Sequence, residues 1–195
     1  MSQHNTGKAT IRANRLLDYH IRMLTNKGIN FKKDDVNYYL YSSESDDYIK
    51  IGYNKSKKLL SRTYNLEFIS VINNIDFTKD FKVKLQFKGM KQIVGAKFVG
   101  SKDQKGYADF FNDEKLLDKV WNMARKIELA YVTIEYKRKT SKLEITVSPY
   151  PGAFLWVIFP PVFYDLKLKE NEILILFNII ETLTEYVNVN LLPND

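Results

Sequence analysis

Cysteine is absent from this chain of 195 residues, and histidine occurs only twice, as His4 and His20. The lack of cysteine excludes disulfide bonds, a thiol nucleophile and a thiolate metal site. No HExxH motif and no paired-histidine spacing exists, so we expect no metal site and no cofactor. The catalytic and phosphate-binding motifs GxSxG, GxxxxGK[ST] and strand-linked GxGxxG are also missing. His20 is a lone histidine on a predicted helix, and we expect it at the surface or at its boundary. These absences argue against an enzyme, with an unrecognised carboxylate-based site left as an alternative.

Long apolar runs are missing as well. No stretch approaches the roughly 18–20 residues of a transmembrane segment, and the start of the chain, MSQHNTGKAT, lacks the apolar core of a secretory signal. Apolar residues make up 45% of the chain and charged residues 27%, which is typical of globular proteins rather than disordered ones. We therefore expect a soluble, cytoplasmic protein.

Positive charge is in excess and is unevenly distributed. The chain has 30 lysine and arginine residues against 23 aspartate and glutamate, a formal net charge of +7. Residues 1–100 hold 18 basic and 9 acidic residues, whereas residues 101–195 hold 12 and 14. Such asymmetry indicates a surface for anions. However, 24 of the basic residues are lysine and only six are arginine, a bias typical of AT-rich genomes such as those of many low-GC bacteria.

Hydrophobic periodicity predicts about three helices. The first covers residues 7–27 and is amphipathic, with a basic side and an end at Gly28. The second covers residues 113–126, with Asn112 or Asp113 as its cap. The third covers residues 170–187 and is apolar around most of its circumference, so we expect it to be largely buried.

Strand patterns lie between these helices and are joined by short turns, which favours a mostly antiparallel sheet and an α+β fold. Residues 54–64 are predicted as a short helix or a loop, and residues 100–106 as a surface loop. We expect a single domain over residues 7–187, or alternatively two similar units over 7–100 and 106–187, with flexible tails at 1–6 and 188–195. The predicted strands are Val36–Tyr41, Tyr48–Tyr53, Leu66–Ile72, Phe81–Lys88, Ile93–Val99, Leu129–Lys137, Lys142–Ser148, Phe154–Phe159 and Val162–Leu168.

An aromatic segment bracketed by prolines, PYPGAFLWVIFPP at residues 149–161, is the first candidate for binding. Its simplest interpretation is a central strand buried on both faces. The alternatives are the lining of an apolar cavity or partner groove, and a loop that enters a membrane interface. The candidate ligand- or partner-binding residues are Tyr150, Phe154, Trp156 and Phe159.

Clusters of basic residues form the second candidate. If two clusters converged in space they would attract phosphates and bind in a salt-dependent manner; otherwise they keep a sheet soluble. The candidate polyanion-binding residues are Lys82, Lys84 and Lys88 on one strand face and Lys137, Arg138, Lys139 and Lys142 at a hairpin turn. Two further clusters are Lys55, Lys57, Lys58 and Arg62, and Lys8, Arg12, Arg15 and Arg22.

The sequence therefore favours a non-catalytic binding or interaction protein. It would engage a partner protein, which includes a second copy of the chain, or an apolar ligand through the sheet and residues 149–164. The alternative is a polyanion binder, directed at nucleic acid or at an acidic membrane surface.

Overall fold

The structure, a computed structural model, describes residues 7–43, 45–88, 95–157, 159 and 162–191. Within these residues, an antiparallel sheet and four α-helices confirm the predicted α+β class, with one helix more than expected. In chain order the elements are α1 (Gly7–Thr25), β1 (Lys32–Asp34), β2 (Asn37–Tyr41), β3 (Tyr48–Lys58), β4 (Ser61–Ile72), β5 (Phe81–Lys88), β6 (Gly95–Val99), the 3-10 helix η1 (Lys102–Gln104), α2 (Lys105–Phe111), α3 (Glu114–Ala124), β7 (Leu129–Lys137), the 3-10 helix η2 (Arg138–Thr140), β8 (Lys142–Pro149), β9 (Phe154–Val157), β10 (Val162–Asp165) and α4 (Glu170–Leu191).

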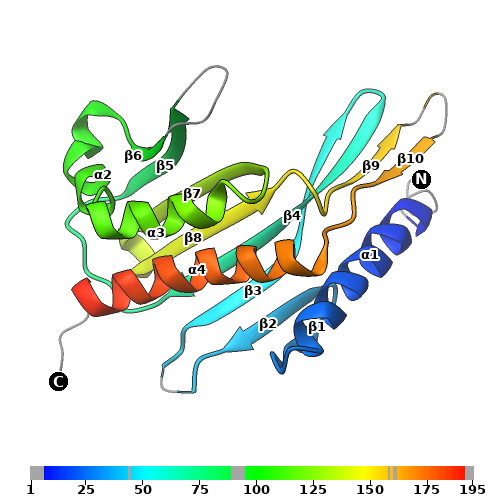
Figure 1. Ribbon diagram of the computed structural model, residues 1–195, viewed down its shortest axis with the longest axis horizontal. Coiled ribbons are helices and arrows are strands. Elements are labelled where there is room, and N and C mark those ends of the chain that lie inside the picture. Colours follow the sequence, from blue (N-terminus) through cyan, green and yellow to red (C-terminus); the bar gives the residue numbers. More distant parts are fainter. Residues whose placement is uncertain (1–6, 44, 89–94, 158, 160–161, 192–195) are drawn as a thin grey trace.

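The sheet has ten strands in the order β1-β2-β3-β4-β8-β7-β5-β6, with β9 and β10 attached at β4. The long strand β4 is shared between two parts of this sheet. Its second half pairs with β8, as in Phe68 with Val147, and its first half pairs with β9, as in Ser61 with Val157. Because β9 also pairs with β10, the β3–β4 and β9–β10 hairpins project side by side beyond the main sheet, at the upper right of Figure 1.

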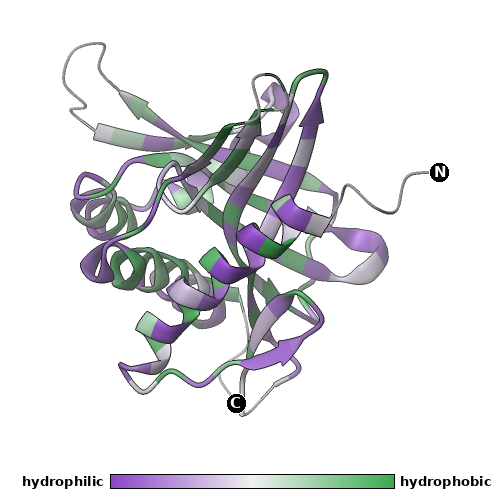
Figure 2. Cartoon of the chain, turned by 90° about the vertical axis from the view of Figure 1, so that its right-hand side faces the viewer, coloured by the Kyte–Doolittle hydropathy of each residue, from purple (hydrophilic) through white to green (hydrophobic). Residues whose placement is uncertain are grey.

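The main core lies between the sheet and the helices. In β8 the alternating residues Leu143, Ile145 and Val147 are fully buried, as the period of two along a strand with one covered face requires. Helix α4 packs on β4 and β8 and also contacts α3, and both helices lie across one face of the sheet in Figure 1. Figure 2 shows hydrophobic residues on the surfaces where helices and strands face each other. The predicted burial of the last helix is confirmed.

Helix α1 joins this core to a second, smaller one. Its C-terminal half contributes Leu17, Ile21 and Leu24 to the main core, and the chain leaves the helix at Gly28, whose φ is 88°. Its N-terminal half packs against the two projecting hairpins. The second core consists of Ala9, Ala13, Leu16, Tyr64 and Phe154.

Two predicted connections are regular structure. Residues 54–64 are not a helix or loop, because β3 and β4 stay paired from Asn54 with Asn65 out to Lys58 with Ser61. This part of the ribbon is largely exposed, so it lacks the alternating burial from which strands are predicted. Residues 100–106, expected to be a loop, include η1 and the start of α2, which is held by buried Ala108 and Phe111.

Two further expectations also differ. The apolar run at 154–159 is not a central strand buried on both faces: β9 has four residues, of which only Phe154 is buried and the others are half-buried. The expected tail at 188–195 begins as helix, because α4 continues to Leu191; residues 192–195 and the expected tail at 1–6 lie outside the described residues. None of the described helices is long and apolar enough to cross a lipid bilayer.

Candidate binding surface

The two projecting hairpins and the first half of α1 form one end of the molecule. We call the described residues 7–17, 53–66, 154–157, 159 and 162–164 the hairpin end. Helix α1 contacts both β3 and β9, and its N-terminus lies beside the two hairpins in Figure 1. Thr10 and Tyr64 join the helix to β4 by a hydrogen bond of 3.2 Å between their hydroxyls. Segments that are about 150 residues apart in sequence therefore present one surface.

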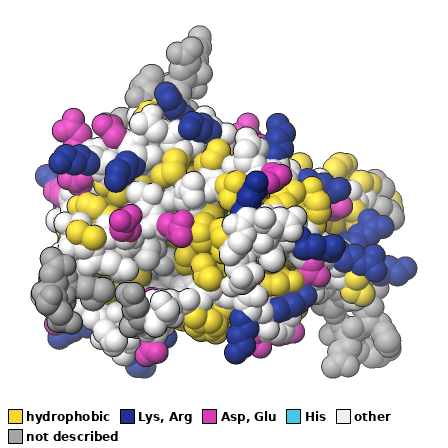
Figure 3. Space-filling view, turned by 60° about the horizontal axis from the view of Figure 1, so that its bottom comes forward, with side chains coloured by type: hydrophobic (Ala, Val, Ile, Leu, Met, Phe, Trp, Pro, Cys, Tyr) yellow, Lys and Arg dark blue, Asp and Glu magenta, His cyan; other side chains and the backbone are white. Residues whose placement is uncertain are grey.

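The hairpin end carries as much net charge as the whole chain. It contains seven lysine and arginine residues and no aspartate or glutamate, and the formal net charge of the chain is +7. The remaining 23 basic residues therefore equal the 23 acidic residues in number. Dark blue Lys and Arg side chains gather at the right-hand end of Figure 3, which is this end of the molecule. The seven residues are Lys8, Arg12, Arg15, Lys55, Lys57, Lys58 and Arg62.

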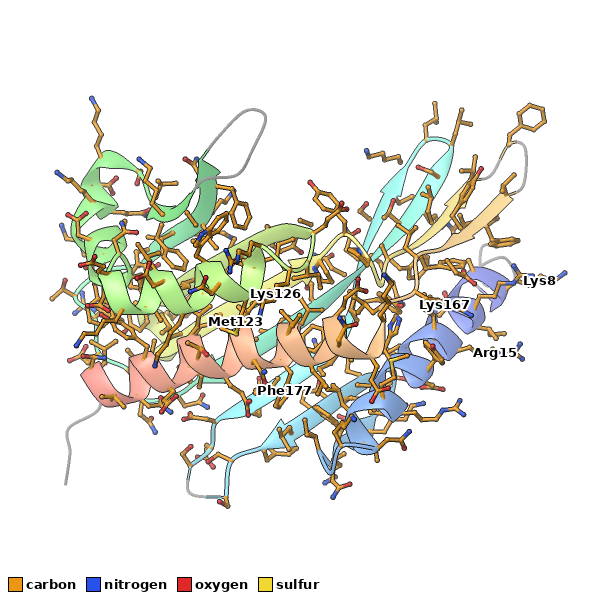
Figure 4. All side chains as sticks on the ribbon, viewed as in Figure 1. Lys8, Arg15, Met123, Lys126, Lys167 and Phe177 are labelled. Carbon is orange, nitrogen blue, oxygen red and sulfur yellow. The ribbon has the colours of Figure 1, made fainter. Side chains whose placement is uncertain are left out.

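None of these seven cations forms an ion pair with a described residue. Three of them lie over aromatic rings instead: Arg12 is 4.2 Å from the centre of the Phe163 ring, Arg62 is 5.1 Å from Trp156, and Lys55 is 5.9 Å from Tyr64. A cation over a ring keeps its charge available to an outside anion. Lys8 and Arg15 project from α1 away from the sheet in Figure 4.

Large apolar side chains cap both hairpins. Leu59 is 91% exposed and Leu60 is 56% exposed, and these two residues form the turn between β3 and β4. Phe159, which lies between β9 and β10, is 77% exposed. In Figure 2 the tip of the β3–β4 hairpin is hydrophobic and the strand below it is hydrophilic.

The four aromatic residues predicted as a binding site occupy four different environments. Phe159 is at the tip, and Trp156 is half-buried below it, stacked on Phe163 with ring centres 6.0 Å apart. The indole N–H of Trp156 is buried and has no hydrogen-bond partner among the described residues. Phe154 is fully buried in the second core and supports the hairpins from inside. Tyr150 is 59% exposed and lies elsewhere, in a groove beside α3.

The predicted polyanion-binding lysines lie in the main sheet and have acidic neighbours. We call Lys82, Lys84 and Lys137, with Glu135 and Glu144, the lysine face. The ammonium of Lys82 is 2.6 Å from the Glu135 carboxylate, and that of Lys137 is 3.6 Å from Glu135 and 3.9 Å from Glu144. The hydrogen bond from Lys82 is the main reason that the pKa of Glu135 is lowered, and the charges of Lys82 and Lys137 add to it. The charges of Lys82 and Lys137 are therefore largely compensated.

The remaining residues of that prediction lie near the same strands. Arg138 and Lys139 are exposed on η2, and Lys142 is half-buried at the start of β8. The backbone N–H of Arg138 donates a hydrogen bond of 2.7 Å to Asp80, which places another carboxylate here. Lys88 ends β5, and its side chain lies outside the described residues.

The sequence pointed to four basic clusters, and the two that converge at the hairpin end are those of α1 and of residues 55–62. Arg22 of the α1 cluster is excluded, because it lies in the last turn of the helix. The sequence does not single out Leu59 and Leu60, because they lie in the stretch that it predicts as a short helix or a loop. The signal that could have found them is two consecutive leucines directly after Lys57 and Lys58, where a turn normally has polar residues or glycine.

Two other features lie away from the hairpin tips. His20, expected near the surface, is fully buried, and its Nε2 accepts a hydrogen bond of 3.2 Å from the Leu168 N–H. Burial, helped by the charge of Lys167, lowers its pKa to about 4, so the imidazole is neutral at pH 7.

A groove of about 530 Å³ between the β2–β3 hairpin and α4 includes Glu181 and Glu185. In the part of the chain that the structure describes, no group of His, Asp and Glu side chains could hold a metal ion.

Residues 27–187 match the family described as "Protein of unknown function (DUF3156)". The chain belongs to this family. The matched segment covers β1 to β10 and most of α4, so it includes the two hairpins and Lys55, Lys57, Lys58 and Arg62. Helix α1 precedes it. Comparison with curated proteins and with solved structures found no match.

Proposed function

We propose that this DUF3156 protein is a non-catalytic binding protein that attaches to an anionic partner through its hairpin end. The observation that carries the proposal is the convergence of seven cations from three segments that contain no acidic residue, none of them in an ion pair with a described residue. Asp165, directly after the third segment, lines a pocket together with Arg12 and Arg15 but forms no ion pair with either of them. Unpaired cations that share one surface add their potentials and attract an anion from a distance of about a Debye length, roughly 8–10 Å in ordinary buffers.

The proposal keeps part of what the sequence favoured. It retains the binding role, the 149–164 segment and a cytoplasmic location as parts of the proposal, and it takes the chemistry of the partner from the polyanion alternative. The cations assigned to the partner change from the lysine face to the hairpin end. On the lysine face, Glu135 and Glu144 lie within 4 Å of Lys82 or Lys137, and a paired lysine attracts an external anion less than an unpaired one.

The test is salt-dependent binding of a generic polyanion, a fluorescently labelled single-stranded oligonucleotide, followed by anisotropy at roughly 50 and 200 mM salt. The variant Lys55→Gln with Lys57→Gln and Lys58→Gln is compared with Lys82→Gln, Lys84→Gln and Lys137→Gln. Each set removes three charges from a net charge of +7, so the pair is matched in overall charge.

We expect the first variant to bind more weakly and to lose about two units from the slope of log K against log salt, at about 0.7 per phosphate. The second variant should bind nearly as the unmodified chain does. The proposal fails if the unmodified chain binds neither the oligonucleotide nor anionic lipid vesicles at low salt. It also fails if both variants lose affinity equally, because binding would then depend on net charge alone.

A further inference from the structure

We infer that the anionic partner is a lipid membrane surface and that the hairpin end enters its interfacial layer with Leu59, Leu60 and Phe159. This inference rests on the proposed function, because the same cations would hold the headgroups. Insertion into a membrane also explains the exposed apolar side chains at the tips, which the binding of a water-soluble anion would not need.

The β3–β4 turn consists of two exposed leucines, Leu59 and Leu60. Lys58 and Ser61 are paired across it, so Leu59 and Leu60 are the two residues of a tight hairpin turn. Such turns favour asparagine, aspartate and glycine. Neither leucine has a positive φ, and with exposures of 91% and 56% neither contributes much to the core. The local fold therefore does not explain why two large apolar residues stand at this point.

The neighbouring β9–β10 hairpin adds a third exposed apolar side chain, Phe159. Ser61 pairs with Val157, and paired strands are about 4.8 Å apart, so the turn with Leu59 and Leu60 and the turn with Phe159 lie next to each other. Two turns from distant parts of the chain thus place exposed apolar side chains at the same end. Exposed apolar groups that gather in this way indicate an interaction site rather than chance.

The order of residue types along the hairpins selects the partner. Apolar side chains form the tips, and Lys58 and Lys57 come directly below Leu59. Half-buried Trp156 lies at the level of Lys57, because both residues pair with Arg62. A membrane offers the matching layers: hydrocarbon for the apolar tips and, next to it, a headgroup interface that holds phosphates and favours tryptophan. A nucleic acid presents phosphates outermost, and these would meet the leucines first. The chemistry therefore favours lipid over nucleic acid.

The experiment measures co-sedimentation of the full chain with two kinds of vesicle, one of phosphatidylcholine alone and one with about 30% phosphatidylserine. The tip variant Leu59→Ser with Leu60→Ser and Phe159→Ser keeps every charge. Its control is Val189→Ser, an apolar residue of α4 with 62% exposure. Circular dichroism of each variant checks that the fold is kept, as expected for exposed positions.

We expect binding to the phosphatidylserine vesicles only, a loss of about 100-fold in vesicle affinity for the tip variant, and no change for the control. In a Trp121→Phe background, brominated acyl chains should quench the fluorescence of Trp156, which is then the sole tryptophan. Oligonucleotide binding by the tip variant should stay within about twofold of the unmodified chain, because its cations remain.

Three results would separate the two proposals. Vesicle binding that is equal for the tip variant and the unmodified chain overturns insertion and leaves an electrostatic binding protein. Oligonucleotide binding without any vesicle binding overturns the lipid partner and keeps the proposed function, with nucleic acid or an acidic protein as the partner. No binding to either probe at low salt overturns both.

Discussion

The hairpin end and the lysine face use the same residue type under opposite conditions. On the lysine face, Lys82 and Lys137 lie within 4 Å of Glu135, and Lys137 also lies within 4 Å of Glu144. At the hairpin end, no carboxylate occurs in any of the three segments. The comparison shows that whether a lysine is paired or unpaired depends on the carboxylates around it, and not on its own position on a strand.

The two regions also rest on different cores. Beneath the lysine face, residues such as Ile134 and Ile145 belong to the main core under the helices. The hairpin end rests on the second core, in which Phe154 packs against Tyr64 and Phe163 with ring centres 5.4 and 5.9 Å away. A small core that is joined to the rest mainly through β4 and α1 can open without the unfolding of the whole molecule.

The largest expected effect is that of Phe154→Ala, which tests whether the second core can unfold separately from the main core. Phe154→Ala removes a fully buried ring and should lower the free energy of unfolding of the hairpin end by about 3–5 kcal/mol. Hydrogen exchange should then accelerate in residues 53–66 and 154–157 while β7 and β8 stay protected. Ile134→Ala is the matched change in the main core, and it should accelerate exchange in both regions. Equal acceleration everywhere in Phe154→Ala would show that the two cores unfold together.

The next effect concerns the link between the hairpin end and α4. His20 accepts the N–H of Leu168, in the segment between β10 and α4, and its pKa is lowered from 6.5 to about 4 by burial and then by Lys167. Because the unfolded chain takes up this proton first, stability is complete above pH 6.5 and decreases as the pH falls towards 4. The decrease attributable to His20 is about 3 kcal/mol.

Urea unfolding between pH 7 and pH 4 measures this effect. His20→Gln, whose side-chain carbonyl can accept the same hydrogen bond, should lose most of the pH dependence in that window. Lys82→Gln on the lysine face should leave it nearly unchanged. If His20→Gln kept the full pH dependence, the buried imidazole would not be its source.

The sequence predicts best where one face of an element is buried. Residues 81–88 and 142–148 alternate apolar and polar side chains, and both became strands at the predicted positions. The same rule fails at residues 54–60, because these residues are exposed on both sides of the ribbon and no burial imposes alternation there. Helix α2 was missed because seven residues with two buried positions are too few for a helical period.

The candidate site depends on contacts that sequence spacing does not contain. Whether Lys82 is free or paired is decided by Glu135, which lies 53 residues further along the chain and directly across the β5–β7 pairing. Whether Leu59 is part of a surface is decided by the pairing of Ser61 with Val157. The residue types of the hairpin end could be seen in the sequence, whereas their convergence needed the register of β4 with β9.

The smallest expected effect comes from a variant that removes the carboxylates of the lysine face and so makes it resemble the hairpin end. Glu135→Gln with Glu144→Gln removes the carboxylates that compensate Lys82 and Lys137, and it should turn the lysine face into a second, weaker anion-binding surface. Because exposed or partly exposed ion pairs contribute about 0–1 kcal/mol each, urea unfolding should show little loss of stability. Oligonucleotide affinity at low salt should rise by a few-fold, with a steeper salt dependence. The control is Asp103→Asn with Glu114→Gln, which raises the net charge equally but lies on η1 and α3. If the control raised affinity as much, net charge and not the local absence of acids would determine where this protein holds an anion.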